Sequence, residues 1–268
     1  SPRTLSAVTV RLCSRTLRSV GIVRTLCEPA DPETCRKAIK PNTNLRYGET
    51  TSNPRGNVLD IEAVAKIAHS ANIPLMIDNT FATPCYQNPL DFGVDIVMHS
   101  ATKYLGGHSD LLGGALVCRS TALRERLFAI QKLTGAVAAP FDCWLTLRGV
   151  RTLEARMAAH SRNARAVAEF LAGHSAVSRV HYPGLPSHPQ HALAARQMRG
   201  FGGMVSFEVK GGGDAATRVL RRTKLFTLAA SLGGVESIIS YPPLMSHAAL
   251  TREERMKRGS GDGLLRLS

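Results

Sequence analysis

Two short apolar runs, each ending in polar residues, constrain the fold of this chain most strongly. Residues 73–77 (Ile-Pro-Leu-Met-Ile) end in Asp78, and residues 94–98 (Val-Asp-Ile-Val-Met) end in His99-Ser100, with Lys103 shortly after. Apolar runs of this length are typical of buried parallel strands. In open α/β sheets, ligands bind at the carboxyl ends of the strands. The sequence therefore predicts an α/β sheet with Asp78 and Lys103 at its ligand-binding edge.

The side chains at these strand ends match the requirements of pyridoxal phosphate. The amine of Lys103 can form a Schiff base with the cofactor aldehyde. A buried carboxylate such as Asp78 can pair with the pyridinium nitrogen and keep it protonated. Ser100 and Thr102 place two hydroxyls just before the lysine, where they can hold the phosphate. We therefore predict a pyridoxal phosphate site at this edge.

A longer motif supports this prediction. Residues 100–110 (Ser-Ala-Thr-Lys-Tyr-Leu-Gly-Gly-His-Ser-Asp) resemble the cofactor-lysine signature of the Cys/Met-metabolism PLP-dependent enzymes. This family includes cystathionine γ-synthase, cystathionine γ-lyase, methionine γ-lyase and the homoserine-ester sulfhydrylases. Further segments that resemble it are 49–54, 140–153, 182–189, 200–207, 231–237 and 262–268. The similarity extends from about residue 10 to the last residue.

The resemblance implies a fold and a division into domains. It implies the PLP fold-type I, an α/β fold whose large domain has a mostly parallel sheet. Residues 1–150 would form this large domain without its N-terminal part, and residues 151–268 a smaller α+β C-terminal domain that is incomplete at its end. The family also forms a dimer of dimers, which implies a homo-oligomer.

The resemblance also assigns the other candidate site residues. Asn53 matches an asparagine near the phenolic oxygen of the cofactor and the substrate carboxylate. Arg266 matches the arginine that binds this carboxylate, for which its planar guanidinium is suited. Ser231 matches a serine that lines the same pocket, and Lys103 is the catalytic lysine. His99, His108 and Asp110 fit no standard metal-ligand spacing, so no metal site is predicted.

The implied activity is trans-sulfuration at the γ-carbon of homoserine-derived amino acids, with cystathionine, cysteine or homoserine esters as substrates. The cystathionine γ-lyase/γ-synthase branch fits best, because residues 141–144 and 182–189 look most similar to it. Ala230 stands where the cystathionine enzymes usually have glutamate, which removes a charge from the substrate pocket. Methionine γ-lyase and O-acetyl- or O-succinylhomoserine sulfhydrylase therefore stay open as alternatives.

Elements of the family at both ends have no counterpart in the motifs. These are a Tyr-x-Arg segment that reaches the phosphate site of a neighbouring subunit, a Gly-Met turn and a tyrosine that stacks on the cofactor. Residues 1–9 do not resemble the family, and Ser268 stands before its last strand and helix. A truncated, catalytically impaired homologue is therefore a further alternative.

Composition excludes several other classes of protein. The net charge of +14 would suit a protein that binds a polyanion such as a nucleic acid. The basic residues are, however, spread along the chain, and only 5% of residues are aromatic. No specific nucleic-acid binding is therefore expected. No apolar run reaches the length of about 18 residues that a membrane helix needs. The six cysteines include no Cys-x-x-Cys pair, which favours the reducing cytoplasm over secretion.

Local patterns also predict individual elements. Asp60 is expected to cap a helix whose buried face carries Ile61, Val64, Ala65 and Ala68. Residues 142–172 should form a long helical segment that breaks near 148–149. Residues 21–26 are expected to form a strand, and Thr251-x-x-Glu254 is a capping box that should open a helix.

Overall fold

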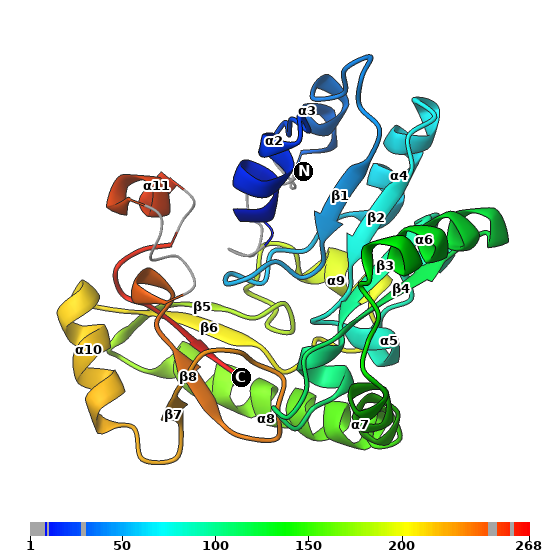
Figure 1. Ribbon diagram of the computed structural model, residues 1–268. Helices are drawn as coiled ribbons and strands as arrows, with labels where there is room; N and C mark the ends of the chain where they lie inside the picture. The colour runs from blue at the N-terminus through cyan, green and yellow to red at the C-terminus, as the bar shows by residue number, and fades with distance from the viewer. Residues whose placement is uncertain (1–8, 10, 28–30, 246–250, 258–259) are drawn as a thin grey trace.

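The computed structural model describes residues 9, 11–27, 31–245, 251–257 and 260–268, and places them around two separate β-sheets (Figure 1). Most of residues 1–9, which carry none of the family motifs, lie outside this set. The structure confirms an α/β fold with one mostly parallel sheet and a second, smaller α+β part. The exact division at residue 150 stays a prediction.

The first sheet brings the predicted strand ends to one edge. Its strands are β1 (Arg46–Glu49), β2 (Leu75–Asp78), β3 (Ile96–Ser100) and β4 (Gly114–Cys118), in that order across the sheet. The first three are parallel and β4 is antiparallel to β3. Glu49 pairs with Asp78, and Asp78 with Met98, so the carboxyl ends of β1, β2 and β3 are level. Asp78 and Ser100 therefore lie on the same edge, as predicted.

Helix α4 (Ile61–Ser70) covers this sheet by the predicted face. The carboxylate of Asp60 accepts a hydrogen bond from the amide of Ala63 at 3.0 Å, which satisfies an exposed N–H of the first turn. The four predicted residues are buried, and they pack with Leu75 and Ile77 of β2. The other short elements of this part are α5 (Thr83–Tyr86), η2 (Pro89–Phe92), η3 (Ala101–Leu105) and α6 (Thr121–Thr134).

Two consecutive helices lead to the second sheet. These are α7 (Pro140–Val150) and α8 (Leu153–Gly173), so the predicted break lies at residues 151–152 rather than at 148–149. Gly149 does not interrupt the helix, because it lies inside α7, where it is buried against the turn after Lys103. The glycine is therefore a packing residue and not a helix breaker.

The second sheet has one face in the core and one face toward the first sheet. Its order is β5-β6-β9-β8-β7, with β5 (Val177–His181), β6 (Val205–Val209), β9 (Leu264–Leu267), β8 (Ile238–Ser240) and β7 (Thr227–Leu228). Helices α8 and α10 (Gly212–Arg222) pack on the apolar face. On the other face Ser206 pairs with Arg266 in register, and the Ser206 hydroxyl donates to the carbonyl of Pro54 at 2.5 Å. This face therefore meets the loop that carries Asn53.

The ends of the described chain give mixed outcomes. The predicted strand at residues 21–26 is wrong, since this stretch has no regular structure before α3 (Pro32–Lys37). Two short helices, η1 (Leu12–Thr16) and α2 (Leu17–Ser19), precede it.

The predicted capping box is confirmed at the start of α11 (Arg252–Lys257). The hydroxyl of Thr251 accepts from the amide of Glu254, and the Glu254 carboxylate accepts from the amide of Thr251. The remaining short helices are α9 (His191–Gln197) and η4 (Pro242–Leu244). Within the part of the chain that the structure describes, no helix is both long and apolar enough to cross a lipid bilayer.

Candidate active site

Asp78 is a buried carboxylate at the end of β2. Its Oδ1 accepts hydrogen bonds from the Thr80 amide at 2.9 Å and the Thr80 hydroxyl at 2.5 Å. Its Oδ2 has only a long contact of 3.4 Å from the hydroxyl of Tyr47. Burial raises the pKa of Asp78 above its usual value, against the opposite effect of the Thr80 and Tyr47 hydrogen bonds. Among the described residues no cationic side chain forms an ion pair with this carboxylate. It can therefore accept a hydrogen bond from a protonated ring nitrogen.

Lys103 lies in an irregular turn directly after β3. Its backbone (φ −96°, ψ −128°) departs from helical geometry within η3. The Nζ atom donates a hydrogen bond of 2.6 Å to the hydroxyl of Ser231, which comes from the loop before β8. Burial, together with the positive charge of Arg266, lowers the pKa of Lys103. The amine therefore has a larger neutral, nucleophilic fraction than an exposed lysine has.

Arg266 on β9 faces the same place from the second sheet. The side chain donates to Oδ1 of Asn53 at 2.9 Å and to the carbonyl of Ser231 at 2.7 Å. Arg266 is only 4% exposed, and its Nε is buried with no hydrogen-bond partner. No carboxylate of the described chain forms an ion pair with this guanidinium, and burial lowers the pKa of Arg266 to about 10. A buried cation in this state is a binding site for an anionic ligand group.

Ser231 connects the two cations through an unusual backbone conformation. Its φ of +77° lies in the left-handed region, which non-glycine residues rarely adopt. This conformation lets the carbonyl accept from Arg266 while the hydroxyl accepts from Lys103. Strained backbone of this kind is concentrated at functional sites. The structure therefore brings Lys103, Ser231, Arg266 and Asn53 into one contact network.

The two hydroxyls predicted to hold phosphate lie on the same strand end. The Ser100 amide donates to the Thr80 hydroxyl at 2.9 Å, which fixes the backbone at this point. The Thr102 hydroxyl accepts from the Gly113 amide at 3.0 Å and so helps to hold the turn. Their roles toward a phosphate stay predictions.

The sequence patterns missed several residues that support this site. Thr80 and Tyr47 contact Asp78, and Arg156 of α8 holds the turn after Lys103. The guanidinium of Arg156 donates to the carbonyls of Tyr104 and Gly149, at 2.7 Å each. A single arginine on a helix has no distinguishing pattern, so only the folded contacts reveal this role.

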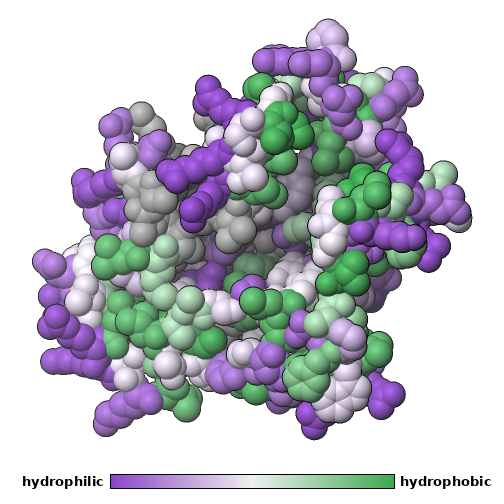
Figure 2. All heavy atoms as spheres, in the orientation of Figure 1, coloured by the Kyte–Doolittle hydropathy of each residue, from purple (hydrophilic) through white to green (hydrophobic). Residues whose placement is uncertain are grey.

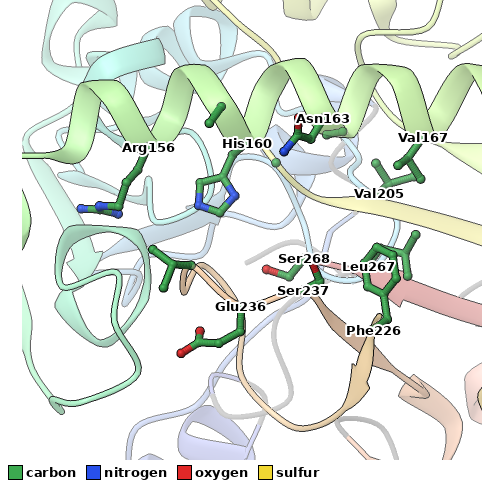
Figure 3. A pocket seen from close by; sticks show the side chains of 14 residues that line it. Arg156, His160, Asn163, Val167, Val205, Phe226, Glu236, Ser237, Leu267 and Ser268 are labelled. Carbon is green, nitrogen blue, oxygen red and sulfur yellow. The ribbon is translucent and has the colours of Figure 1, made fainter. Parts of the chain in front are cut away.

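A pocket with a volume of about 190 Å³ lies beside the site, between α8 and the second sheet (Figure 3). Arg156, His160 and Asn163 of α8 line it, and the ring of His160 points toward the side that carries Ser237 and Ser268. None of the predicted site residues lines it. The prediction that the protein has no metal site stays a prediction. Within the described chain, no group of three or more His, Cys, Asp or Glu side chains could hold a metal ion.

The sequence matches, over residues 2–268, the model of a protein family described as "Cys/Met metabolism PLP-dependent enzyme". The chain belongs to this family. The match begins at residue 2, whereas the motifs indicated similarity only from about residue 10. Pyridoxal phosphate is the cofactor of the family, and it fits the residues present, because Asp78 offers a buried carboxylate without a cation and Lys103 an amine with a lowered pKa.

Curated relatives are similar over most of this chain. A cystathionine beta-lyase from Coxiella burnetii is 49% identical over 252 residues, which is 94% of this chain and 65% of the relative. A cystathionine gamma-lyase from Bacillus subtilis is 48% identical over 260 residues, which is 97% of this chain and 68% of the relative. The chain thus spans about two thirds of the length of these relatives.

Solved structures agree in fold. Cystathionine gamma-lyase from Lactobacillus plantarum complexed with L-serine has a TM-score of 0.96 at 42% identity, and the match covers 100% of this chain and 70% of that one. Cystathionine gamma synthase from Xanthomonas oryzae pv. oryzae in complex with cystathionine has a TM-score of 0.94 at 46% identity, over 100% of this chain and 69% of that one. The family fold predicted from the motifs is therefore confirmed.

Proposed function

We propose that this protein is a PLP-dependent trans-sulfuration enzyme that acts on the γ-carbon of homoserine-derived amino acids, of the cystathionine γ-lyase/γ-synthase type. The observation that carries the proposal is the network of Arg266, Ser231 and Lys103. It places a buried cation without an anionic partner next to an amine with a lowered pKa. An amino-acid substrate needs the cation to bind its carboxylate and the amine to take part in the reaction.

Each candidate residue then has a distinct role. When bound, pyridoxal phosphate supplies an electron sink for a substrate carbanion. Lys103 would hold the cofactor aldehyde, and its amine would carry protons to and from the substrate's carbon atoms. Asp78 would pair with the ring nitrogen, and Ser100 and Thr102 would donate to the phosphate.

Arg266 and Asn53 orient the substrate. The guanidinium of Arg266 can grip a carboxylate with two parallel hydrogen bonds, using its unpartnered Nε as one donor. Asn53 holds the guanidinium from the other side at 2.9 Å. The hydroxyl of Ser231 keeps the Lys103 amine at the same pocket. These contacts would fix the α-carboxylate of the substrate at the guanidinium.

The first test is binding of the cofactor. Lysine-bound pyridoxal phosphate absorbs visible light, so the wild-type protein should gain a stable band and Lys103→Ala should not. Lys66→Ala is a matched control, because Lys66 is an exposed surface lysine paired with Glu62. A band in Lys103→Ala equal to that of the wild type would refute the assignment of the lysine.

Substrate assays separate the alternative activities. Turnover of cystathionine, or of O-succinylhomoserine with cysteine as the thiol, supports the proposed branch. A preference for methionine supports methionine γ-lyase, and use of a homoserine ester with sulfide in place of cysteine supports a homoserine-ester sulfhydrylase. The substitution at Ala230 is the feature that keeps these alternatives in place. A protein that shows the cofactor band but turns over none of the three is the impaired homologue.

We also propose a cytoplasmic homo-oligomer. Large apolar side chains are exposed on α6 and α7, where Figure 2 shows apolar surface (Phe128, Leu133, Phe141, Trp144 and Leu147). Exposed patches of this kind mark protein–protein contacts. All six cysteines are without disulfides, in accord with a reducing compartment. Light scattering of the purified protein tests the assembly, since a strictly monomeric mass would contradict it.

A further inference from the structure

Cys27 and Cys35, which lie outside the candidate active site, have their thiols in contact near the start of β1. The Sγ atoms of Cys27 and Cys35 are 3.2 Å apart, and both side chains are buried, with 3% and 0% exposure. Cys35 comes from α3, which packs against α4 and accepts a hydrogen bond from Arg46 of β1, and Cys27 comes from the loop before α3. A disulfide needs the two sulfurs at about 2.05 Å, which is about 1 Å closer than they are. The pair is therefore close to bonding distance without being bonded.

Arg46 of β1 completes this cluster. Its Nη2 donates to Sγ of Cys27 at 3.1 Å, and its Nη1 donates to the carbonyl of Cys35 at 3.1 Å. Arg46 is only 7% exposed. The salt bridges of the described chain include no carboxylate partner for it. A buried guanidinium without an anion is strongly destabilising. A thiolate at Cys27 supplies that anion, and the Cys35 S–H donates to the same sulfur.

We propose that Cys27 and Cys35 form a reversible dithiol–disulfide site, in which Cys27 is the thiolate nucleophile, Cys35 the resolving thiol and Arg46 the residue that holds the thiolate. A hydroperoxide is the oxidant. The Cys27 thiolate attacks one peroxide oxygen, and the O–O bond breaks to leave a sulfenic acid and, after protonation, water. The Cys35 sulfur then attacks the sulfenic sulfur, the S–S bond forms and a second water leaves. Two thiols and one hydrogen peroxide thus give one disulfide and two waters.

The expected reactivity follows from the charge balance. The hydrogen bond from Cys35, aided by Arg46, lowers the pKa of Cys27 below its usual value, against the opposite effect of burial. At pH 6 Cys27 therefore has a larger thiolate fraction than an ordinary thiol with a pKa of about 8.5. A less basic thiolate is a weaker nucleophile, but with a Brønsted slope of about 0.4–0.5 this offsets only part of the gain in thiolate. We therefore expect Cys27 to be oxidised faster than an ordinary thiol.

The experiment is mass spectrometry of the full chain after limited peroxide treatment at pH 6. We expect Cys27 and Cys35 to become linked, with loss of two hydrogens and return to thiols on reduction with dithiothreitol. Cys143 is the internal control, because it is exposed and has neither of these neighbours. If exposure alone decided reactivity, Cys143 would be oxidised first. Such a result, with Cys27 and Cys35 unlinked, would overturn the proposal.

Variants test the two roles separately. In Cys35→Ser the Cys27 sulfenic acid cannot be resolved, so dimedone should label Cys27 in this variant but not in the wild type. Arg46→Met should slow oxidation of Cys27, and Arg46→Lys should restore part of the rate. Far-ultraviolet circular dichroism checks that each variant is folded. Equal rates in folded Arg46→Met and wild type would remove Arg46 from the site.

Discussion

Replacing Gly149 by alanine gives a sharp test of how α7 packs on the turn that carries Lys103. A Cβ atom at this position would lie 2.6 Å from the carbonyl oxygen of Leu105 and closer still to that of Gly106. Both neighbours are backbone atoms, so they cannot move aside as the tip of a side chain can. Alanine would otherwise favour the helix by about 0.5–1 kcal/mol. The two effects therefore oppose each other.

The steric effect should win. Overpacking of a tight contact costs about 1–3 kcal/mol, and a contact with rigid backbone belongs in the upper half of this range. After the opposing helix preference is subtracted, the net loss of unfolding free energy should be about 1–2.5 kcal/mol. This corresponds to a decrease in Tm of about 2–4 °C for each kcal/mol in a chain of this size. Moving the turn also disturbs the hydrogen bond from Arg156 to the Gly149 carbonyl. We therefore expect weaker binding of pyridoxal phosphate in addition to the lower Tm.

Gly173→Ala is the matched control. Gly173 is the last residue of α8, and a Cβ atom there would have no neighbour within 4 Å. Thermal unfolding followed by circular dichroism should show an unchanged or slightly raised Tm for this variant, which corresponds to a gain of at most about 1 kcal/mol in unfolding free energy. If Gly149→Ala also melts at or above the wild-type temperature with an unchanged cofactor band, the close packing inferred here is refuted.

Three further changes test the site. Thr80→Val removes a charge-assisted hydrogen bond from Asp78, worth about 1.5–3 kcal/mol, so a titration should show at least about tenfold weaker pyridoxal phosphate binding. Arg266→Gln removes a cation that lowers the pKa of Lys103, so the pH at which half of the cofactor band forms should move upward; a downward shift would contradict the electrostatics. Arg156→Gln leaves two carbonyls without their charged donor, so its unfolding free energy should fall by about 2–4 kcal/mol, far more than for an exposed arginine on the same helix.

Local patterns predicted the parts of the fold that depend on near neighbours in sequence. Asp60 and Thr251 cap their helices as expected, because a cap needs only a side-chain oxygen and an amide two or three residues away. Strand ends at Asp78 and Ser100 follow from short apolar runs. Gly149 was misread as a break, since the sequence cannot show that a neighbouring turn approaches the helix at this residue.

Contacts between distant segments could not be predicted in this way. The stretch 21–26 is apolar enough for a strand, but it finds no partner strand in the described chain. The contact between Cys27 and Cys35 depends on how a loop and a helix meet at Arg46, and neither cysteine has a recognisable motif spacing. Asn53 and Arg266 were found only through family resemblance, because 213 positions separate them.

That separation has a consequence for how the protein responds to its ligands. Arg266 belongs to the second sheet and Asn53 to a loop of the first, so a carboxylate bound at the guanidinium occupies a junction between them. A ligand that binds only when both parts are docked stabilises the docked state by RT ln(1 + [L]/Kd). Small amino acids that bind at Arg266 should therefore reversibly stabilise the docked arrangement of the two parts. The temperature at which the two parts separate would then report the ligand concentration, even for compounds that undergo no reaction.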